Sequence, residues 1–374
     1  MKAAATVPGV VADLGDLGSI VEHNGPFLTV YLSTDGTVEN AAIRSEQRWK
    51  TLRRQAAHAG APEDVLGAID PLVGYAHLEG AVLAVVSDAT RVMLTDHLDE
   101  PLEHDRGSWS RLPDLVPLIR SRQSRVPYVL ALADRGGADL TAEGPGGSGI
   151  ERSTGDDDPE RKVHPGGWSQ PRYQQRAEND WAGTAADTAA EVARLSDTVD
   201  ARLIILGGDV RATHMIRDGL PAEMVAKVRL IDQGRATDGS EDARDREIHR
   251  LVATAGAEDT VAVLEKFKEE RGQQDRAVEG VEATVDALNR AAVDVLLVHD
   301  DARGQTTWVG PQPVPIRLDR SSITADDSHL QEAALVDALV RAALGTGASV
   351  RVIPKAGPVH DGIGALLRWS NPST

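Results

Sequence analysis

The first third of the chain alternates short apolar runs with an amphipathic segment. Three apolar runs predict strands: PFLTVYL at residues 26–32, GAVLAVVSD at 80–88 and RVMLTDHL at 91–98. Residues 39–58 predict a helix that would use Ile43, Trp49 and Leu52 as apolar contacts. The proline-punctuated segment that follows these elements indicates a crossing between domains, with a boundary near residue 123.

The middle third opens with two strand-like runs around a Gly-Gly turn, at residues 127–140. Residues 141–167 are rich in Gly, Ser, Asp and Pro and have almost no apolar side chain. Unstructured stretches of this length are usually functional or disordered. A helix follows, because side chains suited to a core recur at helical spacing: Trp181, Ala185, Thr188, Val192 and Leu195. Two further runs predict strands on either side of another helix: ARLIILGGD (201–209) and VRLID (228–232).

Helical periodicity dominates the last third, after a polar break at residues 233–245. Two sets of residues predict helices: Ile248, Leu251, Val252, Leu264 and Phe267 in one, and Val278, Val281, Val285 and Leu288 in the other. The second helix leads into the strand DVLLVHD (294–300), for which TTWVG (306–310) would be the hairpin partner. A last helix, stopped by Gly345 and Gly347, precedes a strand. The alternation predicts an α/β fold with three consecutive α/β domains, at residues 1–123, 124–238 and 239–374.

Composition narrows the classes of function. The net charge of -18 argues against a general nucleic-acid binder and against a DNA partner, since phosphate contacts need Lys and Arg. The absence of cysteine removes disulfides, thiolate metal sites and thiol catalysis, and suits a reducing cytoplasm. The N-terminus shows no export signal, and no apolar run approaches the ~18 residues that span a bilayer. We therefore expect a cytoplasmic protein with no membrane partner.

Basic residues are nevertheless clustered. The segment RSEQRWKTLRR has five basic residues against one acid, and it lies in the predicted helix of the first domain. The five residues are Arg44, Arg48, Lys50, Arg53 and Arg54. A solvated helix face would explain such a cluster, and so would a surface that binds RNA.

Conventional enzyme and metal signatures are absent. Gly207 and Gly208 follow a predicted strand but lack the full dinucleotide or P-loop pattern, so we expect a plain strand-to-helix turn. The acidic run Asp156, Asp157 and Asp158 is not an EF-hand loop and is typical of a solvated loop. The eleven histidines show no metal-ligand spacing. We therefore expect no metal and no cofactor.

The segment HPGGWSQPRYQQR, residues 164–176, is the most distinctive motif of the chain. Gly166 and Gly167 allow the backbone to approach a surface closely, and Trp168 could stack on a nucleobase for about 1–3 kcal/mol. Arg172 and Arg176 lie four residues apart at the start of a helix, where both can address phosphates. This pattern indicates a probe for structured RNA; a loop with the indole folded back onto its own domain is the alternative.

The segment GGWSQPRYQQR resembles the loop of archaeal and eukaryotic class-1 translation release factors, in which Gly-Gly-Gln-Ser is followed by two variable residues and Arg-Phe. Four residues coincide with that pattern, Gly166, Gly167, Ser169 and Arg172, and Tyr173 replaces the Phe. The segments DVLLVHD and GIGALLRW resemble parts of the third domain of release factors and of Pelota. The resemblance implies three α/β domains of the class-1 release factor and Pelota type.

Two departures from the release-factor pattern change the expected activity. Trp168 stands where release factors carry the glutamine that positions water, and an indole has one N–H donor and no acceptor. The first third also has no Asn-Ile-Lys-Ser, the element associated with stop codons. The chain is therefore similar to the bacterial release-factor-like family, which includes a ribosome hibernation factor, and is expected not to be an enzyme.

This resemblance implies a partner and a place for each candidate residue. The partner would be the 70S ribosome, with the protein in the A site, delivered or accompanied by elongation factor Tu. The residues expected on large-subunit RNA at the peptidyl-transferase centre are His164, Gly166, Gly167, Trp168, Ser169, Gln170, Arg172, Tyr173 and Arg176. The basic residues Arg44, Arg48, Lys50, Arg53 and Arg54 are expected on small-subunit RNA near the decoding centre, on charge alone.

Two alternatives stay open from the sequence. A peptidyl-tRNA hydrolase that rescues stalled ribosomes would need Gln170, Gln174 or Gln175 in the role of the missing glutamine. A stress protein without ribosome contact is the other.

Overall fold

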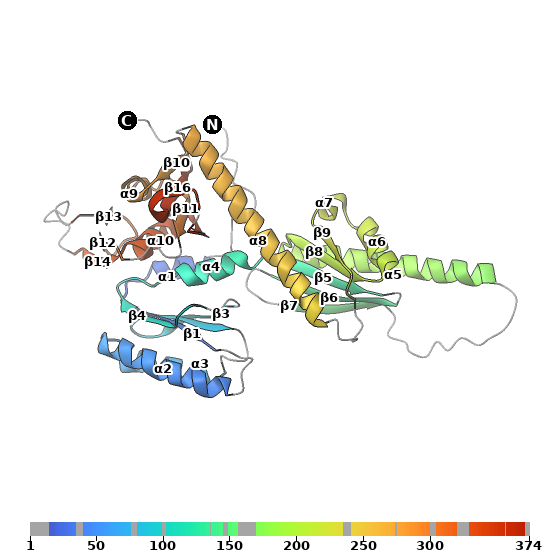
Figure 1. Cartoon of the computed structure of the whole chain (residues 1–374), viewed down its shortest axis with the longest axis horizontal. Coiled ribbons are helices and arrows are strands. Elements are labelled where there is room, and N and C mark those ends of the chain that lie inside the picture. Colours follow the sequence, from blue (N-terminus) through green and yellow to red (C-terminus); the bar gives the residue numbers. More distant parts are fainter. Residues whose placement is uncertain are drawn as a thin grey trace. The chain divides into compact units, whose positions relative to one another are not determined.

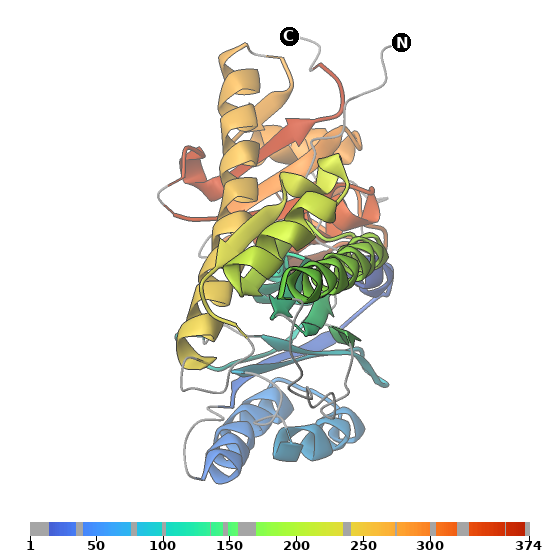
Figure 2. The same cartoon turned by 90° about the vertical axis from the view of Figure 1, so that its right-hand side faces the viewer.

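The computed structural model of the protein describes residues 15–34, 40–75, 81–98, 102–134, 136–144, 149–155, 170–234, 241–273, 275–299, 304–319, 329–355 and 357–370. The chain forms two compact units (Figures 1 and 2). The first unit combines residues 1–123 with residues 259–374, and the second comprises residues 124–258.

The first unit contains a four-stranded antiparallel sheet in the order β3-β2-β1-β4. Its strands are β1 (Phe27–Ser33), β2 (Val82–Ser87), β3 (Val92–Leu98) and β4 (Arg106–Ser110). Strand β1 is buried on both faces: Leu28 and Val30 pack into a core with helices α2 (Ala41–His58) and α3 (Glu63–Tyr75), whereas Phe27 and Tyr31 pack into a second core. The second core includes residues of α1 (Gly15–Val21) and α4 (Val116–Ser124). Five of the seven residues of β1 are apolar and they lie on both faces, as a strand covered on both sides requires.

The last third of the chain adds two more sheets to the same unit. One has the order β10-β16-β11-β15, with β11 and β15 parallel, and the other has the order β13-β12-β14. The strands are β10 (Ala277–Glu279), β11 (Val293–His299), β12 (Thr306–Val309), β13 (Ile316–Arg317), β14 (Gln331–Ala334), β15 (Ser349–Ile353) and β16 (Ile363–Leu367). The helices are α9 (Val281–Asn289), α10 (Leu335–Gly345) and the short 3-10 helix η4 (His360–Gly362).

One hydrophobic core joins the beginning and the end of the chain within this unit, because it contains residues of α1, α4, α9 and α10 together. Arg341, which is 2% exposed, donates to the carbonyl oxygens of Val21 (3.2 Å), Gly310 (2.8 Å) and Pro311. The amide of Gln123 pairs with the backbone of Val352 in both directions, at 2.7 and 2.9 Å. The bonds from Arg341 satisfy its buried guanidinium group. The bonds of Gln123 pair with backbone groups of β15, which lies at the edge of its sheet.

The second unit is a five-stranded sheet in the order β7-β6-β5-β8-β9. Strands β5, β8 and β9 run parallel to one another; β6 is antiparallel to β5, and β7 to β6. The strands are β5 (Tyr128–Ala133), β6 (Gly137–Glu143), β7 (Gly149–Gly155), β8 (Leu203–Gly208) and β9 (Val228–Ile231). The helices are α5 (Gln170–Val199), α6 (Val210–Gly219), α7 (Ala222–Val225) and α8 (Glu241–Gly272), of which α8 continues into the first unit.

Helices cover both faces of this sheet. The core on one face takes Val192 and Leu195 of α5 and Ile216 of α6. The core on the opposite face takes Ile248 of α8 together with alternate residues of β5 and β8. The predicted α/β class is confirmed, and so are the long helix after residue 170 and the strand-to-helix turn at Gly207 and Gly208.

Four predictions of local structure are wrong. Ile43 is 54% exposed, because the buried stripe of α2 follows Ala41, Ser45, Trp49 and Leu52 instead. Residues 141–167 are not free of secondary structure, since β6 ends at Glu143 and β7 follows. Val278 lies in β10, separated from α9 by Gly280 at φ +89°. The segment TTWVG forms β12, which pairs with β13 and β14 and not with β11.

The three-domain division at residues 123 and 238 stays a prediction. Among the described helices, none combines the length and the apolar character that crossing a bilayer requires.

Candidate functional site

The predicted RNA-binding loop falls partly outside the described residues. His164, Gly166, Gly167, Trp168 and Ser169 lie there. The acidic run at residues 156–158 is outside them as well. Gln170 is the first residue of α5, and Arg172, Tyr173 and Arg176 belong to the first two turns of that helix. The motif therefore ends as predicted, at the start of a long helix, and its role stays a prediction.

The C-terminal half of helix α5 packs into the core of its unit. The first buried side chain described on it is Ala185, followed by Ala189, Val192 and Leu195 at helical spacing. Figure 1 shows the first turns of α5 extending beyond the sheet of their own unit. At about 1.5 Å of rise per residue, the 15 steps from Gln170 to Ala185 span roughly 22 Å. We refer to residues 164–181 as the arm.

The arm is basic at its tip. No acidic residue occurs between Arg161 and Arg176, although the whole chain has 58 acidic and 40 basic residues. Residues 172 and 176 share a face of the helix because they are four apart, and residue 173 lies three before residue 176.

Helix α2 presents the second candidate surface. Its buried side carries Trp49 and Leu52, and the indole N–H of Trp49 donates to Asp70 at 2.7 Å. On its outer side Arg44, Lys50 and Arg54 are exposed. Within the described part of the chain these three cations have no ion pair. They are therefore available to an external anion.

The other two cations of α2 are engaged inside the unit. Arg53 forms ion pairs with Glu63 and with Asp70 (3.1 Å), and the hydrogen bond to Glu63, with support from Asp70, raises the pKa of its guanidinium. Arg48 donates to the carbonyl oxygen of Ser33 (3.1 Å) and lies 3.8 Å from the carboxylate of Asp105. The fold thus separates the predicted cluster of five into three outward cations and two that hold neighbouring elements.

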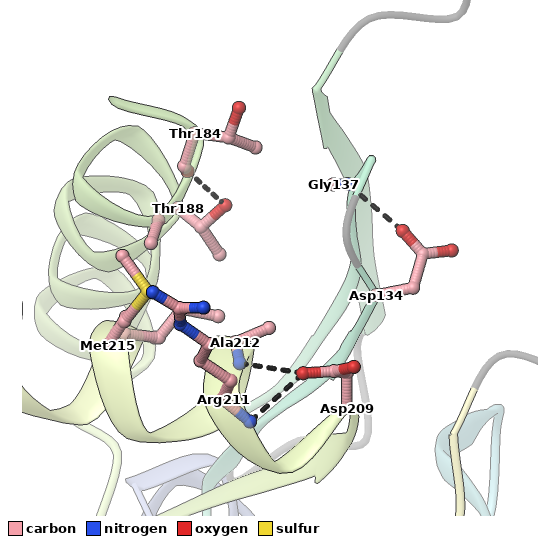
Figure 3. Close-up of a pocket in the computed structure, with 10 residues that line it drawn as sticks. Asp134, Gly137, Thr184, Thr188, Asp209, Arg211, Ala212 and Met215 are labelled. Atoms are coloured by element: carbon pink, nitrogen blue, oxygen red, sulfur yellow. Dashed lines mark hydrogen bonds between the residues drawn. The ribbon is translucent and has the colours of Figure 1, made fainter. Parts of the chain in front are cut away.

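One concave site in the second unit was not predicted from the sequence. A cavity of about 190 Å³ lies between α5, α6 and the carboxyl ends of β5 and β8 (Figure 3). Its lining combines the carboxylates of Asp134 and Asp209 with apolar side chains such as Met215 and Ile216. The sequence did contain an indication of this site, because each of the two acids comes directly after a buried strand. LALA precedes Asp134, and LIILGG precedes Asp209.

Comparison with protein families gives a match in the middle of the chain. Residues 127–273 match the family model named bacterial archaeo-eukaryotic release factor family 2. The matched segment runs from the beginning of β5 past the end of α8, so it includes the arm and the cavity.

Curated relatives extend over almost the full length. Rv2629 of Mycobacterium tuberculosis (strain ATCC 25618 / H37Rv), an uncharacterized protein, is 26% identical over 365 residues, which are 94% of this chain and 95% of the relative. MT2704 of strain CDC 1551 / Oshkosh gives the same values.

Among solved structures, the archaeal translation termination factor aRF1 matches with a TM-score of 0.26 and 14% identity, over 94% of this chain and 96% of that chain. Ribosome-bound archaeal Pelota, from a structure that also contains ABCE1, matches with a TM-score of 0.44 and 14% identity, over 99% and 96%. The middle segment of this chain, residues 127–273, is thus similar to the bacterial archaeo-eukaryotic release factor family 2.

Proposed function

We propose that the protein is a ribosome-binding factor of the hibernation type, most similar to Balon, which occupies the A site and reaches the peptidyl-transferase centre without releasing the nascent peptide. The observation that carries the proposal is the indole of Trp168 at the glutamine position of a release-factor loop, inside the segment that matches a release-factor family. Helix α5 supports it, because its first turns, which follow the motif in sequence, extend beyond the sheet of their own unit (Figure 1).

In this proposal the arm acts as a plug. The glycines at residues 166 and 167 let the backbone approach RNA, and Trp168 stacks on an exposed base. Arg172 and Arg176 neutralise phosphates, with Tyr173 and His164 as further RNA contacts. The indole has no acceptor with which to orient a water molecule, so the ester between peptide and tRNA stays intact.

The outward cations of α2 would contact small-subunit RNA near the decoding centre. Arg44, Lys50 and Arg54 are exposed on one helix of an otherwise acidic protein, and Lys50 and Arg54, four residues apart, share a face of it. The remaining acidic surface would face solvent or a protein partner, for which we propose elongation factor Tu. The protein would then be cytoplasmic and ribosome-associated, and would shield the A site from tRNA.

Sedimentation of the purified chain with vacant 70S ribosomes tests this proposal. We expect binding that weakens as salt rises, since neutralised phosphates release counterions, and that competes with A-site tRNA. Peptidyl-tRNA on the same ribosomes should remain uncleaved. Failure to sediment with ribosomes under low salt would refute the proposal and favour a stress protein without ribosome contact.

A second candidate function is a peptidyl-tRNA hydrolase that rescues stalled ribosomes. Gln170 favours it, because this amide stands two residues from Trp168 at the first position of α5. Measuring the release of labelled peptide from stalled ribosomes separates the two functions. Hydrolysis that is lost in Gln170→Ala would establish the enzyme, whereas the same test on Gln174→Ala and Gln175→Ala covers the other two amides.

A further inference from the structure

Two arginine side chains hold the two ends of one short segment in the first unit. The segment runs from residue 21 to residue 25 and connects α1 to β1. Nε of Arg341, from α10, donates to the carbonyl oxygen of Val21 at 3.2 Å. Nη1 of Arg111, the residue that follows β4, donates to the carbonyl oxygen of Gly25 at 2.9 Å. Two guanidinium groups that are 230 positions apart in sequence therefore reach the same few residues.

Backbone packing fixes Arg111 beside this segment. A Cβ atom at residue 25 would lie 2.5 Å from the backbone carbonyl oxygen of Arg111 and 2.5 Å from the ring of Phe27. No side chain tolerates such distances, so glycine is required for the two backbone segments to approach each other. Phe27 is fully buried and cannot make room. The position of Arg111 thus follows from packing and not from a carboxylate that attracts it.

The two arginines lack a carboxylate partner within the part of the chain that the structure describes. Arg341 is 2% exposed, and its two other hydrogen bonds go to the carbonyl oxygens of Gly310 (2.8 Å) and Pro311. Arg111 makes its hydrogen bond to Gly25. Carbonyl groups satisfy N–H donors but carry no net charge. Two positive charges therefore stay without a counter-charge at this place, which is costly where water is excluded.

An arginine elsewhere in the same unit shows the usual solution. The side chain of Arg122 is 13% exposed, and it forms ion pairs with Asp16 and with Asp96 (2.9 Å). Its charge is therefore balanced by acids from two other elements. Arg111 and Arg341 depart from this pattern, since two cations approach each other with carbonyl oxygens alone around them.

The two guanidinium groups act on each other electrostatically. Burial, and then the positive charge of Arg111, lower the pKa of Arg341 to about 10. Arg341 still carries its charge at pH 7, because this pKa is well above 7. Burial and the nearby charges of Asp114 and Asp337 raise the pKa of the Tyr31 hydroxyl, but neither acid forms an ion pair with the two arginines. An anion beside both guanidinium groups would replace their repulsion by attraction.

Arg111 retains a donor for such an anion. Its Nε is buried and has no hydrogen-bond partner among the described atoms. The N–H of Nε and one N–H of Nη2 lie side by side on one edge of a guanidinium, which is an edge that binds two oxygens of an oxyanion. The bond to Gly25 uses Nη1, on the other side of the group. The edge that suits an oxyanion is therefore not used by the turn.

We propose that a doubly charged oxyanion, the phosphate of a phosphate monoester or inorganic phosphate, binds to Arg111 with the charge of Arg341 behind it. Such a group carries a charge of about -1.5 to -2 at pH 7, which matches two guanidinium groups. Two of its oxygens accept from Nε and Nη2 of Arg111, and the others face water. Because Nε is covered, binding includes a small rotation of the Arg111 side chain, which is partly exposed. The phosphate is either free or the end of a nucleotide.

Calorimetry and thermal unfolding of the full chain at pH 8 and constant ionic strength test this proposal. The ligands are inorganic phosphate, AMP, dimethyl phosphate and acetate, with chloride as the reference anion. Inorganic phosphate should raise the melting temperature above its value in chloride. It should also bind about tenfold or more tightly than dimethyl phosphate or acetate, each of which carries one charge.

Variants of the full chain locate the site. Arg111→Gln should weaken phosphate binding at least about tenfold, and phosphate should no longer raise its melting temperature. If Arg111→Gln does not fold, Arg111→Lys keeps the charge but not the paired donors, and should also bind phosphate more weakly than the original protein. Arg91→Gln removes an exposed arginine between β2 and β3 of the same unit, and should leave phosphate binding unchanged.

Three outcomes would overturn the proposal: no effect of phosphate beyond that of chloride, equal affinity for phosphate and dimethyl phosphate, or equal losses in Arg91→Gln and Arg111→Gln. If Arg111 only holds the turn, Arg111→Gln will lower the melting temperature equally in phosphate and in chloride. AMP that binds at least as tightly as inorganic phosphate identifies a nucleotide as the source, and weaker AMP binding identifies free phosphate. These measurements need no ribosome, so they are independent of the proposed function.

Discussion

Helix α2 and the first turns of helix α5 both gather arginines on an acidic chain, but the fold uses them differently. In α2, Arg53 and Arg48 are held by carboxylates of their own unit, and only Arg44, Lys50 and Arg54 face outward. The arm has no acid between residues 161 and 176, and its helix begins away from the core. A cluster of basic residues in a sequence is thus a binding surface only as far as the fold leaves it unpaired.

Glu270 is the clearest example of a charged side chain that is used in ion pairs within the protein. Its side chain is 3% exposed and lies 2.7 Å from Lys266 and 2.5 Å from Arg276. Burial acts to raise the pKa of Glu270, but the hydrogen bonds from Lys266 and Arg276 outweigh it, so the pKa is lowered. The Glu270 carboxylate contributes to stability. Its removal is therefore expected to give the largest effect among the predictions below.

The largest effect is expected for Glu270→Gln. Losing the buried carboxylate removes the ion pairs to Lys266 and Arg276, which keep only their more exposed partners Glu269 and Asp275, and should lower the free energy of unfolding by about 3 kcal/mol at pH 7. Because the folded pKa is below its ordinary value of 4.5, the stabilisation is present above about pH 4.5 and is lost as the pH falls through the lowered pKa. Urea unfolding of both proteins between pH 3 and pH 8 measures the difference. Glu269→Gln, which removes an exposed neighbour, should change little at any pH.

The arm should affect binding and not stability. Trp168→Ala combined with Arg172→Glu and Arg176→Glu removes a stacking contact and reverses two charges, and should raise the Kd for 70S ribosomes about 100-fold. The melting temperature should stay within about 1 °C, since the first turns of α5 extend beyond the sheet of their unit (Figure 1). Arg194→Glu reverses a charge on the packed part of the same helix and should leave the Kd unchanged. If the arm variant and Arg194→Glu lost ribosome affinity equally, the arm would not differ from the rest of the protein surface in binding.

The outward face of α2 should contribute less. Arg44→Ala, Lys50→Ala and Arg54→Ala together should weaken ribosome binding about tenfold at low salt and reduce the slope of log Kd against log salt by up to about 3. Filter binding at four salt concentrations measures both values. A tenfold loss with an unchanged slope would mean that these cations do not contact phosphates.

The smallest effect is expected for Arg53→Ala. Its ion pairs with Glu63 and Asp70 are at the surface, so their loss should cost about 0.5 kcal/mol of stability and leave ribosome affinity within about twofold. Thermal unfolding and filter binding on the same preparation measure the two values. If Arg53→Ala weakens binding as strongly as the triple variant of α2, the paired and outward cations are not separated in function.

Helices with a strong apolar stripe were predictable from the sequence, and strand partners were not. Val192 and Leu195 identify the buried face of α5 because core packing enforces helical spacing. Strand β7 was missed because an edge strand needs few apolar positions, and GIERSTG has one. Val278 has the spacing of the α9 residues by coincidence. Hydrophobic periodicity contains no information about the turn at Gly280 that separates them.

The candidate site was predictable in part for the same reason. A short motif such as GGWSQ can be recognised from the sequence alone. Which cations of α2 face outward and which are paired depends instead on where Glu63, Asp70 and Asp105 lie in the fold. The cavity depends on the pairing of β5 with β8, which brings Asp134 near Asp209 from 75 positions away in sequence. Apolar periodicity carries no information about such pairings.

Chemical footprinting of large-subunit RNA tests the central claim most directly. Ribosomes saturated with the protein should show protection of nucleotides at the peptidyl-transferase centre, and the protection should disappear with Trp168→Ala even when excess protein keeps the ribosomes occupied. Protection confined to other regions, or protection at that centre that survives the loss of the indole, would contradict the account.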